Sequence, residues 1–192
     1  MVNSDGSRIP PDFEDALLSL RGRRQRPEVH LAEVPPPTRI APYALALTAE
    51  VNPTTEPETM LGNGRFVVLH DPEGQSAWNG TFRIIVMARA TLEDEMGADP
   101  LLGEVGWAWL TDALGSAGAG YHSLSGTVTR VLSESFGGLA LRGRTVEIEL
   151  RASWTPNTTD LGPHLDAWTE LAASAAGLEP LPEGVTALRP HQ

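Results

Sequence analysis

The sequence contains neither cysteine nor lysine, and each absence removes a class of chemistry. All fourteen residues in the combined count of lysine and arginine are arginines. Without cysteine the chain cannot form disulfides, thiolate metal sites or a cysteine nucleophile. Without lysine it can neither form a Schiff base nor supply the lysine of a phosphate-binding P-loop. A GC-rich coding sequence explains the preference for arginine, so we assign it no function.

Two targeting features are also missing, a secretion signal and a long apolar run. The first residues, MVNSDGSRIPPDFED, do not place a basic segment before an apolar one, as a signal peptide would. No apolar run approaches the ~20 residues that a membrane-spanning helix needs. We therefore expect a cytoplasmic protein with no membrane partner.

The chain is acidic, with a formal net charge of −11. Nucleic acids are bound largely by neutralising their phosphates, so a nucleic-acid partner is not expected unless basic residues gather locally. One such group, Arg21, Arg23, Arg24 and Arg26, follows the first predicted helix. These arginines are equally explained as the cationic end of that helix, where the helix dipole favours positive charge.

Length and composition indicate one domain with short tails. Hydrophobic residues make up 41% of the chain, which is enough for a core, and domains commonly hold ~100–150 residues. We place a single domain at residues 9–178, a disordered tail at residues 1–8, and a Pro-rich tail at residues 179–192.

Hydrophobic periodicity predicts the elements of this domain. Helices are expected at residues 9–21, 99–114 and 161–176, and strands at residues 43–51, 65–69, 81–90, 121–136 and 145–154. The order is α-β-β-β-α-β-β-α. Hairpins dominate, so we expect an α+β fold whose mainly antiparallel sheet of about five strands carries helices on one face.

Three stretches of the chain carry further information about the sheet. Residues 81–90 are apolar on both faces, which places them at the sheet centre. Residues 27–42 are an extended connector that has room for a short edge strand. Apolar residues four apart within residues 121–136 fit a strand and also permit a helix for part of the stretch.

The loop predicted at residues 70–80 holds the only group of residues that suggests chemistry. His70, Asp71 and Glu73 could serve a metal ion, or a histidine base oriented by a carboxylate. Asp71 and Glu73 are equally explained as turn residues beside Pro72 and Gly74, and Gln75 shares the loop. We expect no metal, no cofactor and no assembled catalytic set.

Trp78 lies in the same polar stretch and is expected to be an exposed contact residue, since tryptophan is enriched at interface hot spots. We therefore predict a non-enzymatic binding, adaptor or chaperone-like protein with protein partners, for which a homodimer through the free face of the sheet is plausible. The alternatives are a small metal-dependent or hydrolytic enzyme using the loop of His70, and a nucleic-acid accessory protein using residues 21–26.

Most of the chain resembles a family of unknown function found in bacteria with GC-rich genomes, the domain of unknown function DUF3000. The similar stretches are RPEVHLAEVPPPTRIAPYALALTAEV (residues 26–51), GRFVVLHDPEGQSAWNGTFRIIVMARA (64–90), DPLLGEVGWAWL (99–110), SGTVTRVLSESFGG (125–138), ASWTP (152–156) and DLGPHLDAWTELAASAAGLEPLPEGV (160–185). The resemblance implies a cytoplasmic protein and supplies no activity, ligand or catalytic residue. The predicted element order alone is also similar to that of type III secretion chaperones, and a shared fold does not imply a shared function.

Overall fold

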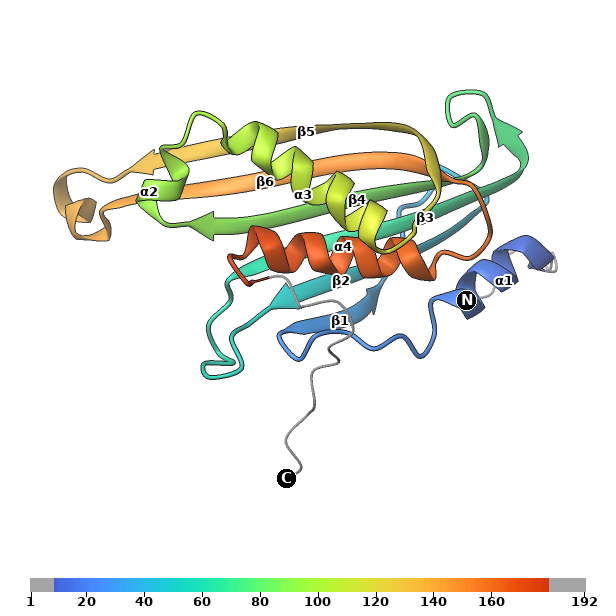
Figure 1. Cartoon of the computed structure of the whole chain (residues 1–192), viewed down its shortest axis with the longest axis horizontal. Helices are drawn as coiled ribbons and strands as arrows, with labels where there is room; N and C mark the ends of the chain where they lie inside the picture. Colours follow the sequence, from blue (N-terminus) through green and yellow to red (C-terminus); the bar gives the residue numbers. More distant parts are fainter. Residues whose placement is uncertain (1–8, 180–192) are drawn as a thin grey trace.

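A six-stranded antiparallel sheet forms the frame of the molecule (Figure 1). The computed structural model describes residues 9–179, without the side chains of Asp94, Glu95 and Arg142. The strand order is β1-β2-β3-β4-β6-β5. The strands are β1 (Val29–Val34), β2 (Tyr43–Val51), β3 (Gly62–Gln75), β4 (Gly80–Leu92), β5 (Tyr121–Glu134) and β6 (Arg144–Pro156).

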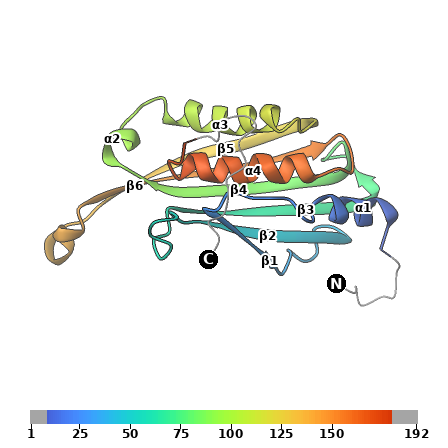
Figure 2. The ribbon, with the colours of Figure 1, turned by 60° about the horizontal axis from the view of Figure 1, so that its bottom comes forward.

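The helices lie on one face of this sheet (Figures 1 and 2). They are α1 (Pro11–Ser19), α2 (Asp94–Gly97), α3 (Leu102–Ser116) and α4 (Gly162–Ala175), with a 3-10 helix, η1 (Gly137–Arg142), between β5 and β6. The helices α3 and α4 run side by side over the middle of the sheet, and α1 packs at one end through Phe13 and Ala16. The predicted α+β fold with helices on one face is confirmed, with six strands instead of about five.

Trp168 attaches α4 to the centre of the sheet. Its ring lies 5.4 Å from that of Phe66, and its Nε1 donates a hydrogen bond to the carbonyl of Met87, 3.1 Å away. A methyl group at Gly64 would come within 2.9 Å of the indole. The glycine in β3 therefore leaves the space that a large side chain from the helix fills, and close packing of this kind dominates core energetics.

The predictions for individual strands need three corrections. The extra strand is β1, which pairs with β2 at the sheet edge. The strands β3 and β4 are longer than predicted, and the expected loop shrinks to a turn at residues 76–79 because paired strand continues through Gln75. The stretch 121–136 is strand from Tyr121 to Glu134.

The tails predicted at residues 1–8 and 179–192 lie outside the described residues, except for Glu179. The carbonyl of Glu179 accepts a hydrogen bond from Nη1 of Arg26 at 2.8 Å.

Candidate functional site

His70 belongs to β3 and faces the helices, where it is 1% exposed. Its ring lies 4.2 Å from that of Phe82 and stacks almost parallel to Phe13 at 5.7 Å. Nδ1 lies 3.1 Å from the carbonyl oxygen of Thr81, so it carries the proton and donates it. Burial lowers the pKa of the imidazole, and Nε2 has no partner among the described residues.

The two acids predicted beside His70 lie in the last residues of β3. Because side chains alternate along a strand, Asp71 faces away from the helices. Its carboxylate accepts hydrogen bonds from the backbone N–H of Glu73 and from Nε2 of Gln75, both at 3.1 Å, while Glu73 is exposed. The structure thus does not bring His70 and the two acids together at one site, and the side chains that the structure describes form no metal-ligating cluster of three or more such groups.

Trp78 is buried, which corrects the expectation of an exposed contact residue. It is 8% exposed and packs with Ala46, Val67 and Leu69. These three side chains lie on the face of the sheet opposite the helices, where they form a small second core. The indole therefore shields apolar strand residues from water. Because it is buried, Trp78 does not indicate a binding site for a protein partner.

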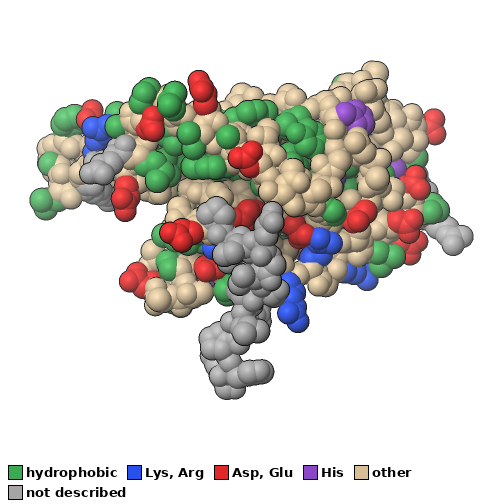
Figure 3. Space-filling view, in the orientation of Figure 1, with side chains coloured by type: hydrophobic (Ala, Val, Ile, Leu, Met, Phe, Trp, Pro, Cys, Tyr) green, Lys and Arg blue, Asp and Glu red, His purple; other side chains and the backbone are tan. Residues whose placement is uncertain are grey.

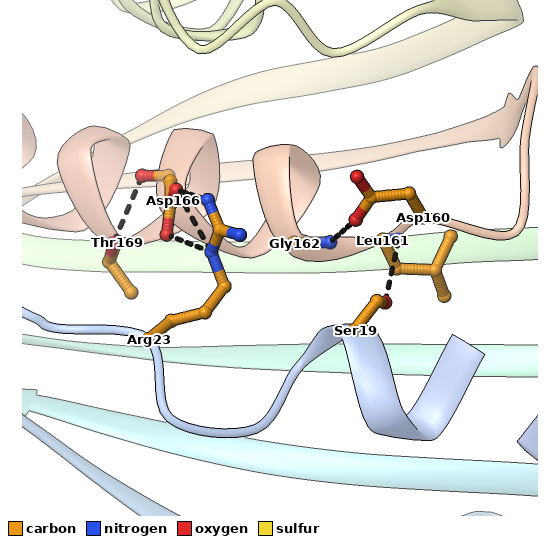
Figure 4. A network of polar contacts seen from close by, with 7 residues as sticks. All are labelled: Ser19, Arg23, Asp160, Leu161, Gly162, Asp166 and Thr169. Atoms are coloured by element: carbon orange, nitrogen blue, oxygen red, sulfur yellow. Dashed lines mark hydrogen bonds and ion pairs between the residues drawn. The ribbon is translucent and has the colours of Figure 1, made fainter. Parts of the chain in front are cut away.

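The predicted basic group is held partly in contacts with α4 (Figure 4). Arg23 pairs with Asp166 through two nitrogens, and this hydrogen bond raises the pKa of the guanidinium. One turn earlier, Oγ of Ser19 accepts a hydrogen bond from the backbone N–H of Leu161 at 2.9 Å. The end of α1 is therefore tied to Leu161, the residue that precedes α4.

Of the remaining three arginines of the group, one lies close to acidic side chains and two are exposed. Arg26 lies 3.5 Å from Glu28 and 3.6 Å from Glu170, whereas Arg21 and Arg24 are exposed. Two of the four guanidinium groups thus fasten the N-terminal segment to the domain.

Apolar side chains are exposed at the opposite end of the molecule, in a feature that periodicity did not reveal. The ends of β5 and β6, joined by η1, project beyond the helices as a narrow extension (Figures 1 and 2). We call residues 131–145 the arm. The exposed fractions of its large apolar residues are Val131 43%, Leu132 49%, Phe136 77%, Leu139 54% and Leu141 103%.

The apolar surface continues from the arm onto the adjoining helices. Met96 of α2, together with Leu101 and Val105 at the start of α3, is exposed as well. A space-filling view shows hydrophobic side chains gathered on the arm and along α3 (Figure 3). Contiguous exposed apolar surface on a folded domain commonly marks an interaction site.

The strand that carries the arm is also a free edge of the sheet. β5 pairs only with β6, in a register that is regular from Ser125 to Glu134. An edge strand presents unpaired N–H and C=O groups, which proteins usually protect with prolines, charges or short length. β5 contains no proline, and the guanidinium of Arg130 turns back to the carbonyls of Gly97 and Asp99, each 3.0 Å away.

Arg83 fixes the beginning of this edge strand. It is 8% exposed, and it reaches from β4 across β6 to the carbonyl of Ser123, 2.9 Å away. Its guanidinium also donates to Oγ1 of Thr155 and to Ser153, and burial lowers its pKa. Ser123 has a φ of 55° and lies where the β5 register shifts, so Arg83 helps to hold this bulge in place.

His122 ties the same bulge to two loops. Its Nε2 lies 2.9 Å from the carbonyl of Asn79, and its Nδ1 lies 2.7 Å from Oδ1 of Asn157. Both ring nitrogens therefore face acceptors, an arrangement that the doubly protonated imidazolium satisfies. These two hydrogen bonds raise the pKa of His122.

The family model of proteins of unknown function DUF3000 matches residues 9–186. The chain belongs to this family. No curated protein and no solved structure matches it. Among the described residues of this DUF3000 member, no helix is long and apolar enough to cross a membrane.

The sequence did contain one signal of the arm. Leu132 and Phe136 continue the apolar spacing of Leu124 and Val128, which predicts a common buried face. In the structure Val128 packs against the core, whereas Leu132 and Phe136 lie near or beyond the end of the helical layer and are exposed. A local pattern records which face is apolar, but it does not record how far the covering helices extend.

Proposed function

We propose that this protein is a cytoplasmic, non-enzymatic adaptor that binds a protein partner through the arm and the free edge of β5. The proposal is carried by one observation, the continuous exposure of apolar side chains along the arm beside a long strand edge that contains no proline. The mode of binding that fits this surface is the addition of a strand to the sheet, in which backbone hydrogen bonds supply affinity and flanking side chains supply specificity.

The free energies of burial and association favour a binding role for this surface. Burying one large apolar side chain contributes about 1.5–3 kcal/mol, so three of the arm residues together contribute several kcal/mol. Association costs ~4–15 kcal/mol in lost freedom of motion, and the arm alone offsets only the lower part of that range. Pairing along the regular part of β5 is the second contribution that makes a stable complex feasible.

The test compares capture of proteins by four forms of the tagged chain, the wild type and three variants. Leu132→Asp and Phe136→Asp place a charge in the proposed contact. Leu18→Asp is a matched control, because Leu18 is 52% exposed and Leu132 is 49% exposed, but Leu18 lies on α1. Proteins captured by the wild-type chain and the control but lost from both arm variants support the proposal. Capture that is equal in all forms overturns it, provided that circular dichroism shows each variant folded.

A further inference from the structure

We infer that the protein occupying the β5 edge is a second copy of this chain, paired antiparallel across a two-fold axis perpendicular to the sheet. The inference rests on the proposed function, because it names the partner of the same surface. Two-fold pairing is the commonest form of self-association, and it joins the same patch of both copies.

The two ends of β5 complement each other in shape. At the Glu134 end the arm projects past the helices with exposed apolar side chains, and at the Tyr121 end the strand lies beside the body of the domain (Figures 1 and 2). Antiparallel pairing of β5 with itself sets the arm of each copy alongside the body of the other. A parallel arrangement would leave both arms together and without a body to cover them.

Antiparallel pairing also brings matching faces of the two sheets together. Directly opposite residues of an antiparallel pair point to the same side of the sheet, and an axis perpendicular to the sheet keeps the helices of both copies on one face. Two sheets of six strands then form one continuous sheet. When β5 overlaps along its full length, the axis passes beside Thr127 or Val128, and Leu132 of one copy lies near Leu124 of the other.

Charge favours the same arrangement. The arm, residues 131–145, contains Arg142, Arg144 and Glu134, a net charge of 2 − 1 = +1, so the rest of the chain carries −11 − 1 = −12. Each positively charged arm therefore lies against the strongly acidic remainder of the other copy. Complementary charges of this kind speed association and fix orientation.

The other edge of the sheet, β1, is a poorer site for pairing with a second copy. β1 is six residues long, Pro27 precedes it, and Pro35 to Pro37 follow it. A short strand flanked by prolines is a poor template for pairing. Of the two edges of the sheet, β5 alone is both long and free of proline.

The first test is molar mass in solution by light scattering over a range of concentrations, with the untagged full chain. We expect a dimer for the wild type and for Leu18→Asp. Leu132→Asp should raise the dissociation constant by roughly 100-fold or more, because the two-fold axis repeats each charge in both halves of the interface. A wild-type chain that is monomeric at about 100 µM, a concentration at which even weak complexes form, overturns the inference.

The second test locates the axis. Because the chain has no cysteine, single-cysteine variants at residues 125 and 127–131 can be oxidised one at a time. A disulfide forms only where the two Cα atoms lie within about 7 Å, so cross-linking should peak at one position, Thr127→Cys or Val128→Cys. A dimer without such a peak contradicts pairing through β5.

These outcomes separate the inference from the proposed function. A monomeric chain that still captures other proteins through Leu132 overturns the inference and leaves the adaptor role standing. A dimer with a cross-linking peak, but with protein capture unaffected by the arm variants, supports the inference and overturns the adaptor role.

Discussion

Trp154 on β6 donates a hydrogen bond from Nε1 to Nδ1 of His164 on α4 across 3.0 Å. The two side chains are 0% and 1% exposed. Because Nδ1 accepts this bond, the proton of the neutral ring is on Nε2. Burial lowers the pKa of His164 to about 4, so the neutral histidine joins the start of α4 to the sheet.

The first prediction is a loss of stability in mild acid. The unfolded chain binds a proton at His164 near its ordinary pKa of about 6.5, while the folded chain does not bind it until about pH 4. The free energy of unfolding should therefore fall as the pH drops through this window, by a total on the order of 3 kcal/mol. Burial of His70 acts in the same direction.

Urea unfolding between pH 7.5 and 4.5 measures this slope. His164→Asn keeps an acceptor for Trp154 but does not titrate, so the variant should lose part of the pH dependence. An identical slope in the variant and the wild type would contradict the assignment.

The second prediction has the opposite sign and concerns His122. Its hydrogen bonds to Asn79 and Asn157 raise its pKa, so its contribution to stability is complete below pH 6.5 and is lost as the pH rises through the folded pKa. Titration by NMR should give a pKa above 6.5 in the wild type. Asn157→Ala should move that pKa back towards its ordinary value, and a wild-type pKa below 6.5 would refute the hydrogen-bond geometry.

The third prediction is that Arg83 maintains the beginning of β5. Arg83→Met removes the charged donor from the carbonyl of Ser123 and from the hydroxyl of Thr155, and hydrogen bonds to a charged group contribute about 1.5–3 kcal/mol. Hydrogen exchange should accelerate around the bulge of β5. Arg89→Met is the control, because the ion pair of Arg89 with Glu147 is exposed and exposed pairs contribute little. Equal effects of the two substitutions would count against the bracing role.

The fourth prediction compares two glycines. A methyl group at Gly126 of β5 would lie 2.4 Å from the carbonyl oxygen of Arg151 and 2.8 Å from the ring of Trp107. Gly126→Ala should therefore destabilise the fold by about 1–3 kcal/mol, as overpacking does. Gly103 in α3 has nothing within 4 Å of the same position, so Gly103→Ala should stabilise by about 0.5–1 kcal/mol. Thermal unfolding of both variants distinguishes these signs.

The sequence predicted the half-buried strands well. The predicted strand at residues 43–51 coincides with β2, and the predicted strand at residues 145–154 falls within Arg144–Pro156. Alternation with one apolar face is a local signal that survives in any fold that covers that face. The sequence also placed the strand of residues 81–90 correctly inside the sheet. This strand is apolar on both faces, a pattern that suits an interior position.

The candidate sites depended on contacts that local patterns do not record. His70 to Gln75 are residues typical of turns, but pairing with neighbouring strands extends β3 through them and buries the imidazole among aromatic rings. Trp78 lies in a polar stretch and is buried because strand residues from β2 and β3 supply apolar partners.

By itself the sequence determined the class of fold and the apolar face of most strands, because both follow from the spacing of side chains along the backbone. The tertiary structure alone decided which apolar residues are covered. The helices protect Val128 but leave about half of Leu132 and most of Phe136 in contact with water, and that difference depends on the length and position of elements distant in the sequence.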